Sequence, residues 1–186
     1  MNIDVRNIKV GDVLFRYLTP YSVWHYGIVI DVVKQNANQI YMLELADSSG
    51  IQHITLTEFM YGRNYFWIDE FRGEITDENS FDIRTRINRA IKLYHENKLL
   101  YTMNYYNCEY FVRRCVFKDP KHWESKQSNK ISESRLSFYK KMGTILLYGL
   151  AEKYYNLNNI EKNSRPTNLR YYVDLNNGKI FQKFYR

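Results

Sequence analysis

The sequence predicts an α+β fold, in which an antiparallel meander sheet is packed on helices. Short runs of β-branched and aromatic residues, separated by polar turns, fill the first half of the chain. Apolar residues recur at helical spacing in the second half. With 186 residues, 45% hydrophobic and 25% charged, the chain matches one ordinary globular domain with a short appendage. A chain of this length buries enough surface to fold without disulfides or metal.

Five short strands are predicted in the first half. The first follows a turn at Gly11-Asp12, and polar turns at residues 34–39 and 47–50 bound the third. Strands rich in Val, Ile, Tyr and Trp between such turns are typical of an antiparallel meander. The predicted strands are residues 13–16, 24–31, 40–46, 51–56 and 65–68.

Two helices are predicted next. The first carries Ile83, Ile87, Ala90, Ile91 and Tyr94 at helical spacing, with Ser80 or Asp82 available as its N-cap. The second opens near Asn107 and places Cys108, Phe111, Val112 and Cys115 on one face.

The C-terminal part is predicted to form a basic, aromatic-rich extension of residues 129–186, packed on or beside a domain of residues 6–128. Residues 121–134 are predicted to be a basic connector, and residues 135–155 are predicted to form a helix with an aromatic and aliphatic face. Residues 171–181 are predicted as a β-hairpin that turns at Asn177-Gly178.

The composition excludes several classes of protein. No apolar run reaches the roughly 20 residues of a membrane-spanning helix, and the first residues lack the pattern of a secretory signal, so a cytoplasmic location is expected. Cys108 and Cys115 lie seven residues apart in one predicted helix, about 10 Å, which is too far for a disulfide and indicates two reduced thiols. The four histidines, His25, His53, His95 and His122, lack the spacing of zinc ligands, so neither metal nor cofactor is expected.

The net charge of +7 is unevenly distributed. Residues 1–80 hold 6 Lys/Arg and 11 Asp/Glu, whereas residues 81–186 hold 21 and 9. No nucleic-acid-binding motif accompanies this charge, so no specific nucleic acid is expected as a partner. Contact with an anionic membrane surface remains an alternative to simple packing of the 135–155 helix on the core. The basic residues that would make this contact are Lys118, Lys121, Lys126, Lys130, Arg135, Lys140 and Lys141.

Cys108 is the candidate nucleophile because of its place in the second helix. A helix N-terminus favours a thiolate through its dipole and free N–H groups, and the same groups stabilise an oxyanion. Asn107 is the expected cap and oxyanion support. Cys115, two turns further on, has neither advantage and is predicted to be a core residue.

His25 and Glu44 each lie among apolar neighbours in a predicted strand. A buried imidazole or carboxylate needs a polar partner. Hairpins that turn within the two polar stretches would put residue 25 opposite 44 and residue 44 opposite 53. His25, Glu44 and His53 are therefore predicted to form one cross-strand row on one face of the sheet. From these residues alone, two interpretations remain: the side chains are hydrogen-bonded core residues, or they form a catalytic site.

Three blocks of sequence carry a resemblance. They are residues 10–14 (VGDVL), 24–30 (WHYGIVI) and 106–112 (YNCEYFV), followed by Ser125-Lys126-Gln127. In this order they resemble the motifs of the LRAT-like family, which includes lecithin:retinol acyltransferase and related phospholipid acyltransferases. That family belongs to the permuted papain-like, NlpC-type superfamily. The resemblance spans about residues 6–128.

The resemblance implies a permuted papain-like fold with the nucleophile at a helix N-terminus. It makes Cys108 the nucleophile, His25 the general base and Glu44 the third residue, where many relatives have a histidine. His53 is the alternative third residue. Tyr110 replaces the histidine of the family's helix motif, and residues 129–186 match nothing in the family.

The implied function is thiol-dependent acyl transfer, by an acyltransferase or a hydrolase, through an acyl-enzyme on Cys108. The substrate would be a lipid, a thioester or a peptide or amide. A cysteine peptidase or amidase of the NlpC type is the first alternative. A catalytically silent binding module on the same scaffold is the second.

Overall fold

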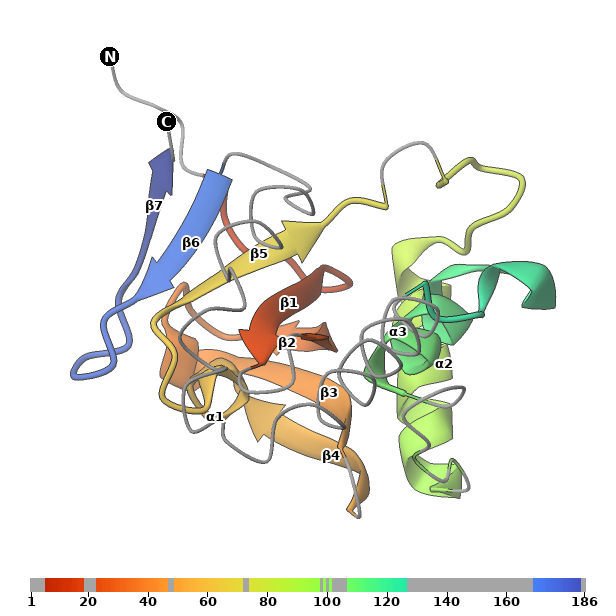
Figure 1. The fold of residues 1–186 in the computed structure, drawn as a ribbon, viewed down its shortest axis with the longest axis horizontal. Helices are drawn as coiled ribbons and strands as arrows, with labels where there is room; N and C mark the ends of the chain where they lie inside the picture. Colours follow the sequence, from red (N-terminus) through yellow and green to blue (C-terminus); the bar gives the residue numbers. More distant parts are fainter. Residues whose placement is uncertain are drawn as a thin grey trace, which may run out of the picture.

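The structure is a computed structural model that describes residues 6–18, 23–46, 49–71, 74–97, 99, 101, 107–126 and 169–184. Within these residues, one sheet of seven antiparallel strands runs in the order β4-β3-β2-β1-β5-β6-β7 (Figure 1). The α+β class and the antiparallel sheet are therefore confirmed. The strands are β1 (Val13–Leu18), β2 (Val23–Val32), β3 (Ile40–Ala46), β4 (Gly50–Thr55), β5 (Tyr65–Asp69), β6 (Leu169–Val173) and β7 (Ile180–Phe184).

The meander prediction holds for β1 to β4 and is wrong for β5. β5 pairs with β1, at the opposite side of the meander from β4. The chain is redirected by a short helix, α1 (Leu56–Met60), so Leu56 begins a helix and does not end a strand. Thr55 and Glu58 form a capping box at the start of α1, and Tyr61 ends it in the left-handed conformation.

The two longer helices begin at capping residues that the sequence indicated. Asp82 caps α2 (Ile83–Glu96) by accepting from the N–H of Thr85 at 3.0 Å. Ser80, the other predicted cap, donates its hydroxyl to the carbonyl of Thr76. Helix α3 (Cys108–Val116) begins after Asn107, and two 3₁₀ turns complete the helical elements in the described residues: η1 (Ala37–Gln39) and η2 (Pro120–His122).

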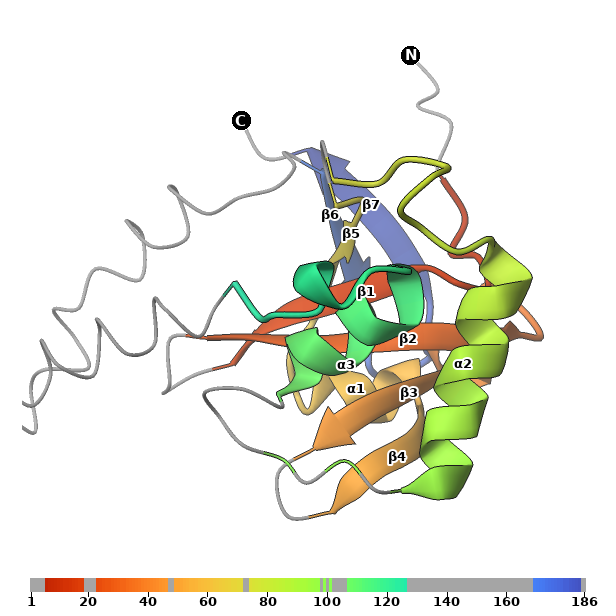
Figure 2. The same ribbon diagram turned by 90° about the vertical axis from the view of Figure 1, so that its right-hand side faces the viewer.

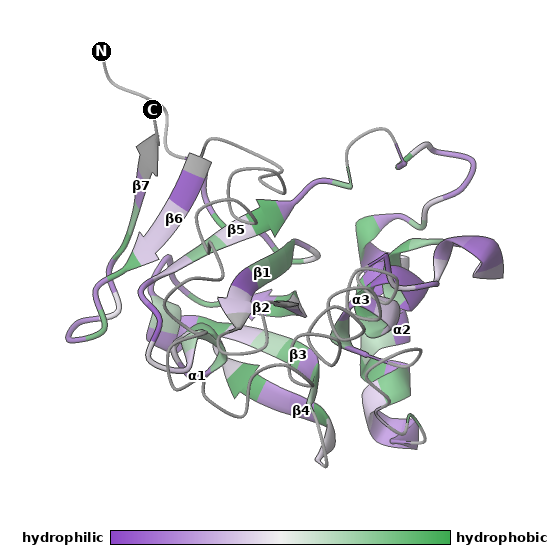
Figure 3. Ribbon diagram, viewed as in Figure 1, coloured by the Kyte–Doolittle hydropathy of each residue, from purple (hydrophilic) through white to green (hydrophobic). Residues whose placement is uncertain are grey.

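The sheet has an apolar layer on each face because successive side chains of a strand point to opposite sides. Helices α2 and α3 lie together in front of β2 and β3 (Figure 2), where Phe15 and Trp67 pack with Phe111. The other face carries α1 and a second cluster that includes Leu14 and Phe59. The connection from β5 to α2 is largely hydrophilic (Figure 3).

The C-terminal hairpin extends the sheet beyond β5. β6 pairs with β5 and with β7, so the predicted hairpin is confirmed. Val173 pairs with Ile180, so the hairpin turns through a loop of residues 174–179 that includes the predicted turn residues Asn177-Gly178. Asp174 organises this loop, since its carbonyl accepts from the N–H of Gly178 at 2.7 Å. The predicted helix of residues 135–155 lies outside the described residues.

Among the described helices, none is long and apolar enough to cross a membrane. Three of the basic residues expected at a membrane surface lie in the described part, and each has a protein partner. Lys118 donates to the carbonyl of Asp77, Lys121 pairs with Asp119, and Lys126 pairs with Glu74. The other four basic residues lie outside the described residues.

Candidate active site

Cys108 is the first residue of α3 and is buried, with 4% of its surface exposed. The side chain of Asn107 accepts from the N–H of Tyr110 at 3.0 Å, which is the capping role that the sequence predicted. The Cys108 thiol donates to the carbonyl of Trp24 on β2 at 3.7 Å. Both cysteines are free thiols. The ring of Tyr110 packs edge-on to Trp123.

His25 joins the thiol to a carboxylate. Its Nε2 lies 2.6 Å from Oε2 of Glu44, and both side chains are about nine-tenths buried. Because a carboxylate only accepts, the Nε2–H of His25 donates to it. The Cys108 side chain also interacts with the His25 ring, and this interaction raises the pKa of His25. The three side chains thus form a thiol–imidazole–carboxylate chain.

The register between β2 and β3 explains why Glu44 meets His25. The ladder between these strands ends at Gly27 paired with Glu44, and a bulge shifts it between Val29 and Asp31. The prediction that residue 25 lies directly opposite 44 is therefore wrong by two residues. A shift of two keeps the side chain on the same face, so His25 reaches Glu44 diagonally.

Packing against Phe59 holds the imidazole of His25 in place. The His25 ring stacks on Phe59 of α1, with ring centroids 5.6 Å apart. A Cβ at Gly27 would lie 3.1 Å from Phe59 and 3.3 Å from the carbonyl oxygen of Leu43. Gly27 therefore leaves the space that lets Phe59 lie close to the strand beside His25.

The electrostatic environment favours the imidazolium form of His25. Burial by itself lowers the pKa of His25, but Coulombic attraction to Cys108 and hydrogen bonds to Cys108 and Glu44 outweigh burial and raise the pKa to about 9. Cys115 lies in a different environment, because complete burial raises its pKa to about 12. The two cysteines of one helix are thus a polar, partnered thiol and an inert core thiol.

His53 does not join this group. It pairs with Leu43 across the β3–β4 ladder, whereas Glu44 pairs with Gln52. The predicted row was wrong by one residue here, and a one-residue shift puts a side chain on the other face. The exposed His53 ring lies near those of Tyr41 and Tyr94, with centroids 5.6 and 6.4 Å away.

Sequence reasoning missed Arg16, which is the cross-strand partner of His25. Only 5% of Arg16 is exposed, and its Nε donates to the carbonyl of Phe59. The sequence contained an indication that Arg16 is buried. In a strand, residue 16 lies on the same face as residue 14 and on the opposite face from residues 15 and 17. Arg16 therefore shares the face of Leu14, which belongs to the core.

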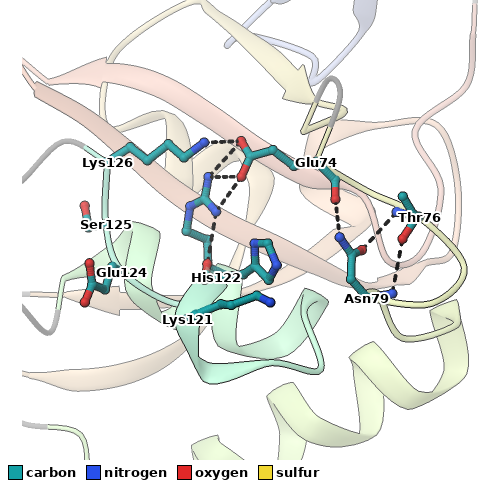
Figure 4. A pocket seen from close by; sticks show the side chains of 9 residues that line it. Glu74, Thr76, Asn79, Lys121, His122, Glu124, Ser125 and Lys126 are labelled. Carbon is teal, nitrogen blue, oxygen red and sulfur yellow. Dashed lines mark hydrogen bonds and ion pairs between the residues drawn. The ribbon is translucent and has the colours of Figure 1, made fainter.

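A second set of buried charges fixes α3 to the rest of the chain. Arg113 bridges Glu109 and Glu74 at 3.0 Å each, and the hydroxyl of Ser125 donates to Glu109 at 2.8 Å. Figure 4 shows Glu74 in this network, with Lys126 bound to its carboxylate. A cavity of about 380 Å³ borders Glu74, Arg113 and Ser125. Cys108, His25 and Glu44 do not line it, so this network positions the helix and not the thiol site.

Comparisons of the chain with protein-family models, with curated proteins and with solved structures found no match. In the part of the chain that the structure describes, no three His, Cys, Asp or Glu side chains are grouped to hold a metal ion.

Proposed function

We propose that the protein is a thiol-dependent acyl-transfer enzyme on a permuted papain-like scaffold, with Cys108, His25 and Glu44 as its catalytic residues. The observation that carries this proposal is the buried chain of contacts from a thiol at a helix N-terminus, through an imidazole, to a carboxylate. Nucleophile, base and orienting group in hydrogen-bond reach of one another are the requirement of covalent catalysis by cysteine.

The reaction follows from the atoms available. The thiolate of Cys108 attacks the carbonyl carbon of an ester, thioester or amide, a C–S bond forms, and the carbonyl electron pair moves to oxygen. Collapse of this tetrahedral intermediate breaks the bond to the leaving group, which takes a proton from the His25 imidazolium. His25 then removes a proton from water or an amine, whose attack on the thioester releases the acyl group and restores the thiol.

The first turn of α3 supports the oxyanion. Helices leave their first backbone N–H groups without an intrahelical acceptor, and the N–H of Cys108 is at the first helical position. Such donors stabilise the negative oxygen of a tetrahedral intermediate. Asn107 contributes by holding the helix start in place through its cap.

The experiment is intact-protein mass spectrometry after incubation with an acyl thioester, a phospholipid or a p-nitrophenyl ester. We expect an added acyl mass that maps to Cys108 in the wild type and in Cys115→Ser, and none in Cys108→Ser. Turnover of an acyl p-nitroanilide, an amide, but of none of these three substrates would favour the peptidase or amidase. No adduct and no turnover, with Cys108 as slow toward iodoacetamide as Cys115, would make the protein a silent binding module.

A further inference from the structure

Arg16 lies beside the candidate catalytic residues without belonging to the chain of hydrogen bonds. It is paired with His25 across the β1–β2 ladder, so both side chains are on one face of the sheet. The guanidinium carbon is 5.3 Å from the ring centroid of Phe59, the ring on which His25 stacks. Phe59 therefore supports both cationic groups.

The guanidinium is also incompletely satisfied. Its Nε donates to the carbonyl of Phe59, but Nη1 is buried and has no hydrogen-bond partner. A guanidinium is always charged, and a buried charge without a full set of partners is destabilising unless opposite charges lie near. Burial lowers the pKa of Arg16, and Coulombic interactions with Glu44 on β3 and Cys108 on α3 act in the opposite direction.

We propose that Arg16 is a positioning residue that stabilises the ionised site by supplying its second positive charge. The inference rests on the proposed function, in which Cys108 reacts as a thiolate. The imidazolium of His25 can balance one negative charge, but the ionised site holds two, on Cys108 and on Glu44. With Arg16 the buried site has two positive and two negative charges, so the thiolate is balanced while Glu44 stays ionised.

Among the described residues, the other charged groups near Arg16 do not take this role. Arg63, which follows α1, repels Arg16, and the exposed ring of Tyr61 lies 5.9 Å from its guanidinium. On α3, Glu109 is paired with Arg113. Arg16 is buried, pairs with His25 across the β1–β2 ladder and interacts electrostatically with Cys108, so we expect removal of its charge to change the reactivity of the thiol.

The test is the pH profile of Cys108 alkylation by iodoacetamide, followed by mass spectrometry. Arg16→Met and Arg16→Gln remove the charge, Arg16→Lys keeps it, and Arg86→Met is the matched control. Arg86 is also partly buried and donates its Nε to a carbonyl, but its charged neighbours are Asp82 and Asp12. Removing one charge from a buried group of charges can destabilise a fold, so a circular dichroism spectrum first checks that each variant is folded.

Both neutral variants should be alkylated on the order of tenfold more slowly than the wild type at pH 7, with the profile moved to higher pH. Arg16→Lys and Arg86→Met should keep the wild-type profile. An unchanged profile in folded Arg16→Met, or the same loss in Arg16→Lys as in Arg16→Met, would overturn the role of the charge. So would unfolding of both neutral variants, which would make Arg16 a structural residue. Slow alkylation of Cys108 in the wild type itself would instead overturn the proposed function.

Discussion

Glu44 and His25 are bound to one another although they are not paired in the sheet. Their Oε2 and Nε2 atoms are 2.6 Å apart, while the backbone of Glu44 pairs with Gly27. The two-residue offset keeps both side chains on one face, and Gly27 leaves room for Phe59 beneath the imidazole. We expect this buried pair to orient the imidazole toward Cys108.

Glu44→Gln should lower turnover by at least about tenfold and leave the fold intact. The amide keeps the shape of the side chain but no longer stabilises the imidazolium electrostatically. In the serine-protease triad, replacing the orienting aspartate by asparagine lowers kcat about 10⁴-fold. A smaller loss is expected here, because a thiolate and an imidazolium stabilise one another. The measurement is steady-state turnover together with a circular dichroism spectrum.

His53→Asn is the control for this prediction. It should keep wild-type turnover because His53, near Tyr41 and Tyr94, lies on the sheet face opposite to His25 and Glu44. Full activity in Glu44→Gln beside a large loss in His53→Asn would transfer the third catalytic role to His53 and contradict the register seen here.

Cys115 should resist alkylation in the folded protein even at pH 9. Complete burial raises its pKa to about 12, so the thiolate is scarce at that pH and is also inaccessible. Iodoacetamide labelling with peptide mapping should find Cys115 modified only after addition of denaturant. Labelling of Cys115 under native conditions at the rate of a free cysteine would show that α3 opens from the sheet.

The stability that His25 contributes should fall as pH rises. Its pKa is about 9 in the folded protein and about 6.5 in an unfolded chain. A raised pKa of this kind stabilises the fold fully below pH 6.5, and the contribution is lost as pH rises through 9. The advantage of wild type over His25→Asn in unfolding free energy should therefore shrink by at most about 3 kcal/mol between pH 6.5 and 9.5.

Urea titrations at several pH values measure this difference. Starting at pH 6.5 keeps Asp69 out of the comparison, because burial raises the pKa of Asp69 to about 6 and its titration lies largely below the chosen range. An advantage that is constant or grows with pH would contradict an imidazolium at His25.

Ser125→Ala should lower the unfolding free energy by about 1–3 kcal/mol, since it leaves the buried carboxylate of Glu109 without one of its donors. Lys126→Ala is the neighbouring control. Its ion pair with Glu74 is mostly exposed on the lysine side, and such pairs contribute about 1 kcal/mol or less. Chemical denaturation of both variants decides the matter. Equal losses would mean that the buried network at α3 does not depend on Ser125.

Local features of the fold could be predicted from the sequence wherever the residues of one short segment determine its structure. Residues 40–46 form a strand because they are apolar and bounded by polar turns, and Asn107 caps α3 because its side chain bonds within the same turn. Cys108 at the helix start, and buried His25 and Glu44 in need of polar partners, were predicted in the same way. Features that depend on distant segments were predicted less well. The pairing of β5 with β1 depends on how α1 redirects the chain.

The sequence by itself determined the residue types of the site and their local setting: a thiol at a helix N-terminus, and an imidazole and a carboxylate in apolar strands. Only the tertiary structure decided which of these side chains meet. The bulge in β2 put Glu44 on the same sheet face as His25. A shift of one residue between β3 and β4 put His53 on the face opposite to Glu44. The physical reason is the two-residue period of a strand: a register error of one residue, which local sequence does not exclude, exchanges the two faces of the sheet.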